Sequence, residues 1–169
     1  KVTHCSWPAA SEVYKRHHIA YLDRHRTIIR SIAETESYTI TLGPEDLQVD
    51  ALGGLLTIER IEKEDLETLR VPPEVALLDA DKVGYPLTVR LWKEGDSFIP
   101  FRMSGHKKVK DYLIDEKIPL PDKERQLVIL SENGIVWLVG RRIDDRYRIT
   151  ETTTHVLRIT QSACDEGIL

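Results

Sequence analysis

Five side chains that could bind an anion lie within nine consecutive positions of this sequence. They are Arg102, His106, Lys107, Lys108 and Lys110, and they stand out because the formal net charge of the chain is -4. The spacing predicts a helix that begins at His106, directly after Gly105. Backbone N–H groups at the start of a helix suit a phosphate, and His106, Lys107 and Lys110 would share one side of that helix. We therefore expect an anion-binding site at this point.

A second basic group follows the apolar run at residues 135–139. It comprises Arg141, Arg142, Arg146 and Arg148. If both basic groups share one face of the protein, they form a patch suited to a nucleic-acid backbone. The alternative is a solvated face whose cations pair with the neighbouring carboxylates Asp111, Asp115, Asp144 and Asp145, and composition favours neither. Residues 1–85 hold 10 Lys and Arg against 15 Asp and Glu, whereas residues 86–160 hold 14 against 11, which favours the second half as the anion-binding half.

Other patterns point away from catalysis within this chain. Asp144-Asp145 is more typical of a turn, with carboxylates that cap backbone N–H groups or pair with Arg, than of a metal site. The spacing of His17, His18 and His25 does not match a helical zinc site. The sequence has no GxxxxGK[ST], GxGxxG, GxSxG or HExxH motif. We therefore expect no catalytic residue and no metal site here, and we assign Trp92 and Trp137 to the core.

The elements that must position these residues indicate an α+β fold with mostly antiparallel sheets. We expect two small β units, each with one or two helices, that meet at Pro72-Pro73: a linking domain at residues 1–73 and a C-terminal domain at residues 74–169. Helices are predicted at 11–22, 63–70 and 106–115. Strands are predicted at 26–32, 37–42, 47–49, 55–61, 75–79, 87–92, 127–130, 135–139, 146–150 and 155–160. Asn133-Gly134 predicts a hairpin, since both residue types tolerate positive φ.

The rest of the composition is that of a water-soluble protein. No apolar run reaches the roughly 18 residues of a membrane span, and the N-terminus has no signal-peptide pattern. Cys5 and Cys164 show neither the spacing of a zinc site nor a disulfide framework. We expect a cytoplasmic protein with no membrane contact.

Residues 79–160 carry a longer pattern. It consists of Asp79-Ala-Asp81, Pro86-Leu87 with Arg90, Gly95-Asp96-Ser-Phe98 with Pro100, Met103-Ser-Gly105, Lys107-Lys108-Val109-Lys110-Asp111-Tyr112-Leu113-Ile114-Asp115, Lys117-Ile118-Pro119, Arg125, Ile135-Val-Trp137 with Gly140, and Arg142-Ile143-Asp144-Asp145-Arg146. In this order, the pattern resembles the C-terminal domain of the tRNA(Ile)-lysidine synthetases. It covers about half of the chain.

The resemblance implies a role. This family uses ATP, with Mg²⁺, to join lysine to the wobble cytidine of the tRNA(Ile) with a CAU anticodon. The chemistry belongs to an N-terminal PP-loop domain with an SGGxDS motif. That motif is not in this sequence, so we expect the catalytic domain and its ATP site to lie outside this chain, which needs no cofactor of its own. The part described by this sequence would bind the acceptor stem of the tRNA.

The resemblance also implies which residues contact RNA. Motif position and charge indicate Arg90, Arg102, Lys107, Lys108, Lys110, Arg125 and Arg142, and charge alone adds His106, Arg141 and Arg146. The expected partners are the tRNA, the catalytic domain of the same protein and a second copy in a homodimer. Two alternatives stay open: a protein-interaction module that packs on a partner domain or subunit, and a domain of a phenylalanyl-tRNA synthetase β-subunit.

Overall fold

The structure is a computed structural model that describes residues 18–23, 26–31, 38–52 and 54–163. Its strands are β1 (His18–Asp23), β2 (Arg26–Ser31), β3 (Thr39–Leu42), β4 (Gln48–Ala51), β5 (Gly54–Glu62), β6 (Val75–Asp79), β7 (Leu87–Leu91), β8 (Ser97–Phe98), β9 (Lys107–Lys108), β10 (Leu127–Ser131), β11 (Gly134–Leu138) and β12 (His155–Ala163). The α-helices are α1 (Val109–Asp115) and α2 (Leu120–Glu124), and single 3-10 turns lie at η1 (Lys63–Asp65) and η2 (Asp145–Tyr147).

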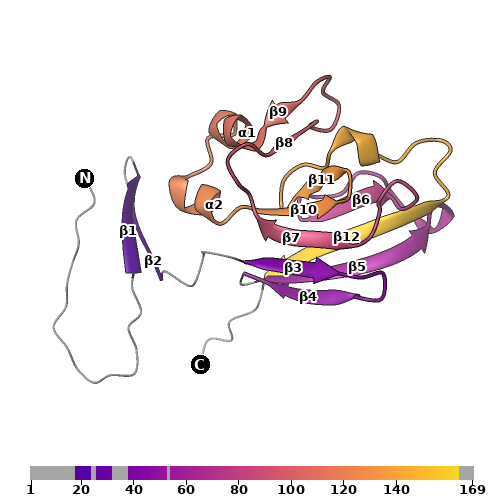
Figure 1. The fold of residues 1–169 in the computed structure, drawn as a ribbon, viewed down its shortest axis with the longest axis horizontal. Coiled ribbons are helices and arrows are strands. Elements are labelled where there is room, and N and C mark those ends of the chain that lie inside the picture. The colour runs from indigo at the N-terminus through magenta and orange to yellow at the C-terminus, as the bar shows by residue number, and fades with distance from the viewer. Residues whose placement is uncertain (1–17, 24–25, 32–37, 53, 164–169) are drawn as a thin grey trace.

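Two four-stranded antiparallel sheets form the centre of the molecule (Figure 1). The first has the order β11-β10-β7-β3 and the second β4-β5-β12-β6. Alternate apolar residues of both sheets are buried in one shared core, among them Val89 and Ile129 of the first sheet and Ile58 and Ile159 of the second. Each such side chain contributes about 1.5–3 kcal/mol through burial. The α+β class with mostly antiparallel sheets is thereby confirmed.

A third layer covers the outer face of the first sheet. Phe98 of β8 and Val109, Tyr112 and Leu113 of α1 form a second buried cluster with residues of β10 and β11. The rings of Phe98 and Tyr112 meet edge to face, with centroids 5.3 Å apart. This packing fixes the β8–β9 hairpin and α1 to the sheet. The two helices described here, of seven and five residues, are too short to span a membrane.

The sheets connect segments on both sides of residue 73. β3 pairs with β7, and β5 and β6 both pair with β12. The predicted division between residues 73 and 74 therefore falls between two strands of a single sheet. Sequence patterns identify strands but not their partners, because any strand edge offers the same backbone N–H and C=O groups.

Three predicted elements differ in the structure. The predicted 11–22 helix is wrong over residues 18–22, which belong to strand β1 and pair with β2; residues 11–17 lie outside the described residues. Of the predicted helix at 63–70, only the 3-10 turn η1 forms. The turn η2 (Asp145–Tyr147) replaces the start of the predicted strand at 146–150, because the Asp144 carboxylate caps the Arg146 N–H.

The hairpin predicted at Asn133-Gly134 is confirmed, with a different turn. Ser131 pairs with Gly134, so the two-residue loop is Glu132-Asn133, and Gly134 alone takes a positive φ, of 114°. The register of β10 and β11 then shifts between Ile129 and Leu130. Such a bulge bends the strand. It lies in the β10–β11 hairpin, which directly precedes the second basic group in the chain.

Candidate nucleic-acid interface

The basic segment at 102–110 forms a hairpin and then a helix. Lys107 and Lys108 are strand β9 and pair with Phe98 and Ser97 of β8. Helix α1 begins only at Val109, whose N–H donates to the Asp96 carbonyl. The predicted start at His106 is therefore wrong: β8, anchored by buried Phe98, offers backbone partners that residues 107 and 108 take instead.

Two consequences follow for the predicted anion site. His106, Lys107 and Lys110 do not share a helix face, since the first two precede α1. Gly105 has a φ of 103° but lies in the β8–β9 loop, four positions before the first helical residue. The predicted phosphate site at a helix start directly after Gly105 is absent from this segment.

Arg90 forms a structural ion pair. Its two terminal nitrogens donate to the two Asp96 carboxylate oxygens, each at 2.8 Å, and both side chains are largely buried. Burial alone would raise the pKa of Asp96, but the hydrogen bonds and charge of Arg90 outweigh it and hold that pKa below its ordinary value. A planar two-point pair of this kind is strong and geometrically specific. It fixes the turn between β7 and β8.

Asp144 is the centre of the second basic group. Its side chain is fully buried and accepts four hydrogen bonds of 2.9 Å, from the N–H groups of Ile99 and Arg146 and twice from the Arg146 guanidinium. This contact raises the pKa of Arg146. Asp145 accepts from the Arg102 N–H and pairs with Arg148. The interpretation of Asp144-Asp145 as a turn that caps N–H groups and pairs with Arg is confirmed.

The two basic groups meet at Tyr112. The Lys107 ammonium lies 5.8 Å from the centre of its ring. Burial raises the pKa of the Tyr112 hydroxyl, and the nearby Arg142 partly offsets that rise. Arg141 is also near enough for its charge to act on Tyr112, and its Nε–H donates to the side chain of buried Gln126. Tyr112 therefore brings cations from β9 and from the chain after β11 to one face. Neither Tyr112 nor Gln126 was among the residues that the sequence predicted to contact RNA.

Acidic side chains pair with part of this face. Lys107 pairs with Asp115 at 2.6 Å, a contact that raises the pKa of Lys107, and Lys110 pairs with Glu94 at 3.1 Å. Both pairs are partly or largely exposed, so water and salt screen them and a phosphate can compete for the cation. Both hypotheses for the basic residues therefore apply in part: cations of the two groups lie near one another, and some of them pair with neighbouring carboxylates.

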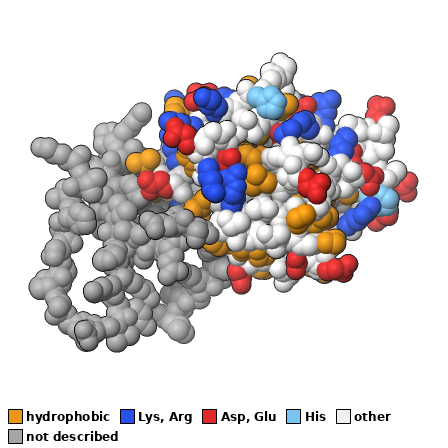
Figure 2. Space-filling model, in the orientation of Figure 1, with side chains coloured by type: hydrophobic (Ala, Val, Ile, Leu, Met, Phe, Trp, Pro, Cys, Tyr) orange, Lys and Arg blue, Asp and Glu red, His pale blue; other side chains and the backbone are white. Residues whose placement is uncertain are grey.

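The other predicted contacts differ in exposure. Arg102, His106, Lys108 and Arg142 are exposed, and Arg125 donates to the Leu52 carbonyl. Figure 2 shows Lys and Arg side chains over the part of the surface where α1 and the β8–β9 hairpin lie, with Asp and Glu side chains among them. The surface is mixed in charge rather than uniformly basic.

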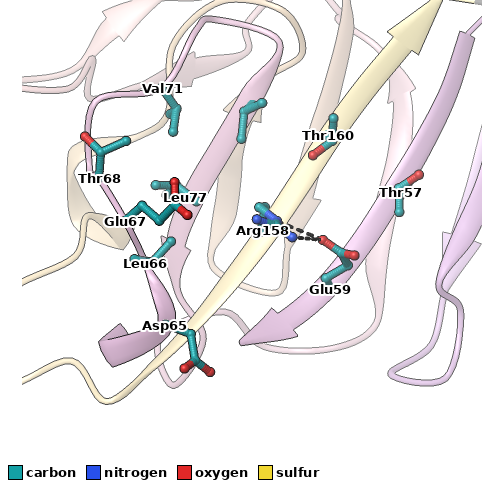
Figure 3. A pocket seen from close by; sticks show the side chains of 11 residues that line it. Thr57, Glu59, Asp65, Leu66, Glu67, Thr68, Val71, Leu77, Arg158 and Thr160 are labelled. Atoms are coloured by element: carbon teal, nitrogen blue, oxygen red, sulfur yellow. Dashed lines mark hydrogen bonds and ion pairs between the residues drawn. The ribbon is translucent and has the colours of Figure 1, made fainter. Parts of the chain in front are cut away.

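A pocket of about 620 Å³ lies elsewhere, on the outer face of the second sheet (Figure 3). Glu59 and Arg158 form an ion pair across its floor, with oxygen and nitrogen 2.6 Å apart, and Leu66 and Val71 line it from the segment that follows η1. Glu59 and Arg158 are thus already paired, and the other charged residues that line the pocket, Asp65 and Glu67, are acidic. Within the described ranges no group of three or more His, Cys, Asp or Glu side chains is placed to hold a metal ion.

Comparison with known proteins identifies the basic half of the chain. Residues 87–159 match the family described as the TilS substrate C-terminal domain. A tRNA(Ile)-lysidine synthase of Parabacteroides distasonis is 40% identical over 151 residues, which are 85% of this chain and 33% of that protein. This chain contains the C-terminal domain of the tRNA(Ile)-lysidine synthase family. The corresponding enzyme of Bacteroides thetaiotaomicron is 42% identical over 120 residues, 61% of this chain and 28% of its own length.

The fold of the TilS C-terminal domain agrees with this assignment. A crystal structure of a TilS C-terminal domain superposes with a TM-score of 0.65 at 21% identity, covering 77% of this chain and 99% of that one. This chain spans about a third of the length of the curated relatives it matches. The family match includes β7 to β12 and therefore every predicted RNA-contacting residue.

Proposed function

We propose that this chain is the tRNA-binding end of an ATP-dependent ligase that joins lysine to the wobble cytidine of the CAU-anticodon tRNA(Ile), in the cytoplasm. The proposal is supported by relatives named tRNA(Ile)-lysidine synthase. Its catalytic step, with ATP and Mg²⁺, would belong to a domain that this chain does not include, and that domain would be its partner within the same protein.

We infer that the chain binds the acceptor stem of that tRNA. The observation that carries this inference is that Lys107 lies over the Tyr112 ring, while Arg141 and Arg142, from a separate segment, are near enough for their charges to act on the Tyr112 hydroxyl. Double-helical RNA presents two phosphate strands beside a wide, shallow minor groove. A rigid face with several separated cations can bind such a helix by its shape, without reading its bases.

The ten predicted contacts divide into three groups under this proposal. Arg90 and Arg146 hold buried or largely buried carboxylates, so their main contribution would be to the fold that carries the interface. The exposed side chains of Arg102, His106, Lys108 and Arg142 would contact phosphates, as would Lys107 and Lys110 after exchange of their carboxylate partners. Arg125 and Arg141 would border this surface.

The test is filter binding of the chain to a CAU-anticodon tRNA(Ile) transcript and to a mini-helix of its acceptor stem, across a salt series. Lys107→Ala with Lys108→Ala should weaken binding and flatten the dependence on salt, since each lost phosphate contact reduces the slope of log K against log[salt] by about 0.7–0.9. Arg70→Ala is the matched control: it removes an exposed cation from the segment beside the pocket on the second sheet. Unchanged affinity and slope in the double variant would refute the proposal.

Packing against a catalytic domain and formation of a homodimer stay predictions. Large exposed hydrophobic side chains that such contacts could cover are Leu47, Leu69, Met103, Ile114 and Leu120. Light scattering of the purified chain tests the homodimer.

A further inference from the structure

Arg102 has an unusual backbone conformation at an exposed position. It lies in a tight turn in which the Met103 N–H donates to the Pro100 carbonyl at 2.8 Å, and its φ is 65°. A positive φ at the third residue defines a type II turn, where glycine or asparagine is usual. Any residue with a Cβ atom costs free energy in this conformation. The turn is therefore strained at the residue that carries the guanidinium.

The Asp145 carboxylate holds this strained turn in place. Its Oδ1 accepts the Arg102 N–H at 2.9 Å, although the two residues are 43 positions apart. The Asp145 N–H donates to the Ile99 carbonyl at 2.7 Å, and the Phe101 N–H donates to the Ile143 carbonyl at 3.1 Å. The carboxylate is itself oriented by Arg148, 3.2 Å away. Contacts from the η2 region thus fix the turn from several sides.

The side chain that this turn presents is free to bind. The Arg102 guanidinium lies 5.4 Å from the centre of the Phe101 ring, and among the described residues no carboxylate pairs with it. Arg90, Arg146 and Arg148, in contrast, each pair with an Asp. Backbone strain that the surrounding structure maintains is a feature of functional sites. Here the strain places an unpaired cation at the tip of the β8–β9 loop.

We propose that Asp145 is a positioning residue for RNA: by accepting the Arg102 N–H, it holds the β8–β9 loop so that the Arg102 guanidinium meets an RNA phosphate. The inference rests on the proposed RNA-binding function and assigns a role to a carboxylate inside a basic surface. Asp145 does not contact the RNA in this scheme and acts through the backbone of Arg102.

The sign of the effect separates this role from simple electrostatics. An acidic side chain near a polyanion weakens binding by repulsion, so charge alone predicts that removing Asp145 strengthens RNA binding. Positioning predicts the reverse for Asp145→Ala, which removes the acceptor. Asp145→Asn keeps an oxygen that can accept the Arg102 N–H and should retain wild-type affinity or exceed it slightly.

The experiment measures binding of the 169-residue chain to the CAU-anticodon tRNA(Ile) transcript at one fixed salt concentration. Asp145→Ala should lower the affinity about three- to tenfold, the range expected for one charge-assisted phosphate contact. Arg102→Ala should lower it by a similar factor, and the double variant should be no weaker than Arg102→Ala alone, because both changes remove the same contact. Asp145→Glu keeps the charge but displaces the acceptor, so it should also weaken binding.

Each outcome decides the inference. If Asp145→Ala binds the tRNA as tightly as the wild type or more tightly, the inference is overturned. It is also overturned if the losses of affinity caused by Asp145→Ala and Arg102→Ala multiply in the double variant. If Asp145→Ala does not fold, wild-type affinity in folded Asp145→Glu overturns it equally. A wild-type chain that binds neither the tRNA nor the mini-helix overturns the proposed function and this inference together, whereas normal wild-type binding with unaffected Asp145 variants overturns the inference alone.

Discussion

Replacing Asp144 by asparagine should destabilise the protein by about 3 kcal/mol. All four partners of the carboxylate are donors: Oδ1 accepts from the Arg146 N–H and Nε–H, and Oδ2 accepts from the Ile99 N–H and the Arg146 Nη2. Asparagine has a single acceptor oxygen, so its NH₂ group must face two of these donors. Two hydrogen bonds to a charged group are lost, each worth about 1.5–3 kcal/mol.

Partial exposure of the partner reduces the total. The Arg146 side chain is 39% exposed and can regain water, whereas the Asp144 side chain, which is 0% exposed, cannot. We therefore expect the lower end of the summed range. For a protein of this size, about 3 kcal/mol corresponds to a fall of about 6–12 °C in the unfolding midpoint.

Urea unfolding followed by tryptophan fluorescence measures this loss, because Trp137 is fully buried in the core. Asp81→Asn is the matched control: the same chemical change is made at a carboxylate that is 58% exposed and 3.5 Å from the exposed Arg60. That pair should contribute less than about 1 kcal/mol. If Asp144→Asn costs no more than the control, the buried carboxylate does not organise this region and our reasoning is refuted.

Three further predictions concern other parts of the structure. The pKa values of Asp79 and Asp96 are held below the ordinary value by their hydrogen-bonding partners, despite burial. Their stabilising contribution should be complete above about pH 4 and be lost as the pH falls further through the lowered pKa values, since the unfolded chain then binds more protons. The unfolding midpoint should therefore fall less steeply with decreasing pH in Asp96→Asn than in the wild-type protein. Gly54→Ala should destabilise by about 1–3 kcal/mol in urea, because its Cβ would lie 2.9 Å from the Ser162 carbonyl oxygen in the paired strand, and an unchanged midpoint would contradict this contact. Tyr112→Phe should change stability by about 1 kcal/mol or less yet weaken RNA binding, because it removes the hydroxyl that lies near Arg142; equal affinity in filter binding would remove Tyr112 from the proposed interface.

Local patterns in the sequence were sufficient for much of the fold. Alternating and apolar runs located most strands of the two central sheets, and the hairpin at Asn133-Gly134 followed from its residue types. The predicted helix at 106–115 was correct only from Val109, since the pairing of Lys107 and Lys108 with β8 depends on the burial of distant Phe98. Local patterns could not predict the order of strands in each sheet either, because strand pairing also depends on contacts between distant residues.

The sequence by itself determined the charge of the second half, the α+β class and the resemblance to the C-terminal domain of the lysidine synthetases, because composition, periodicity and motif order are local properties of the chain. The tertiary structure decided what each cation does. Arg90 and Arg146 hold carboxylates, and Lys107 lies over the Tyr112 ring with Arg142 nearby. Arg102 has a strained backbone and pairs with no carboxylate of the described residues. Contacts over 40 or more positions, such as that between Asp145 and Arg102, arise only when separate elements pack together, so residue type alone could not separate the structural cations from those available to RNA.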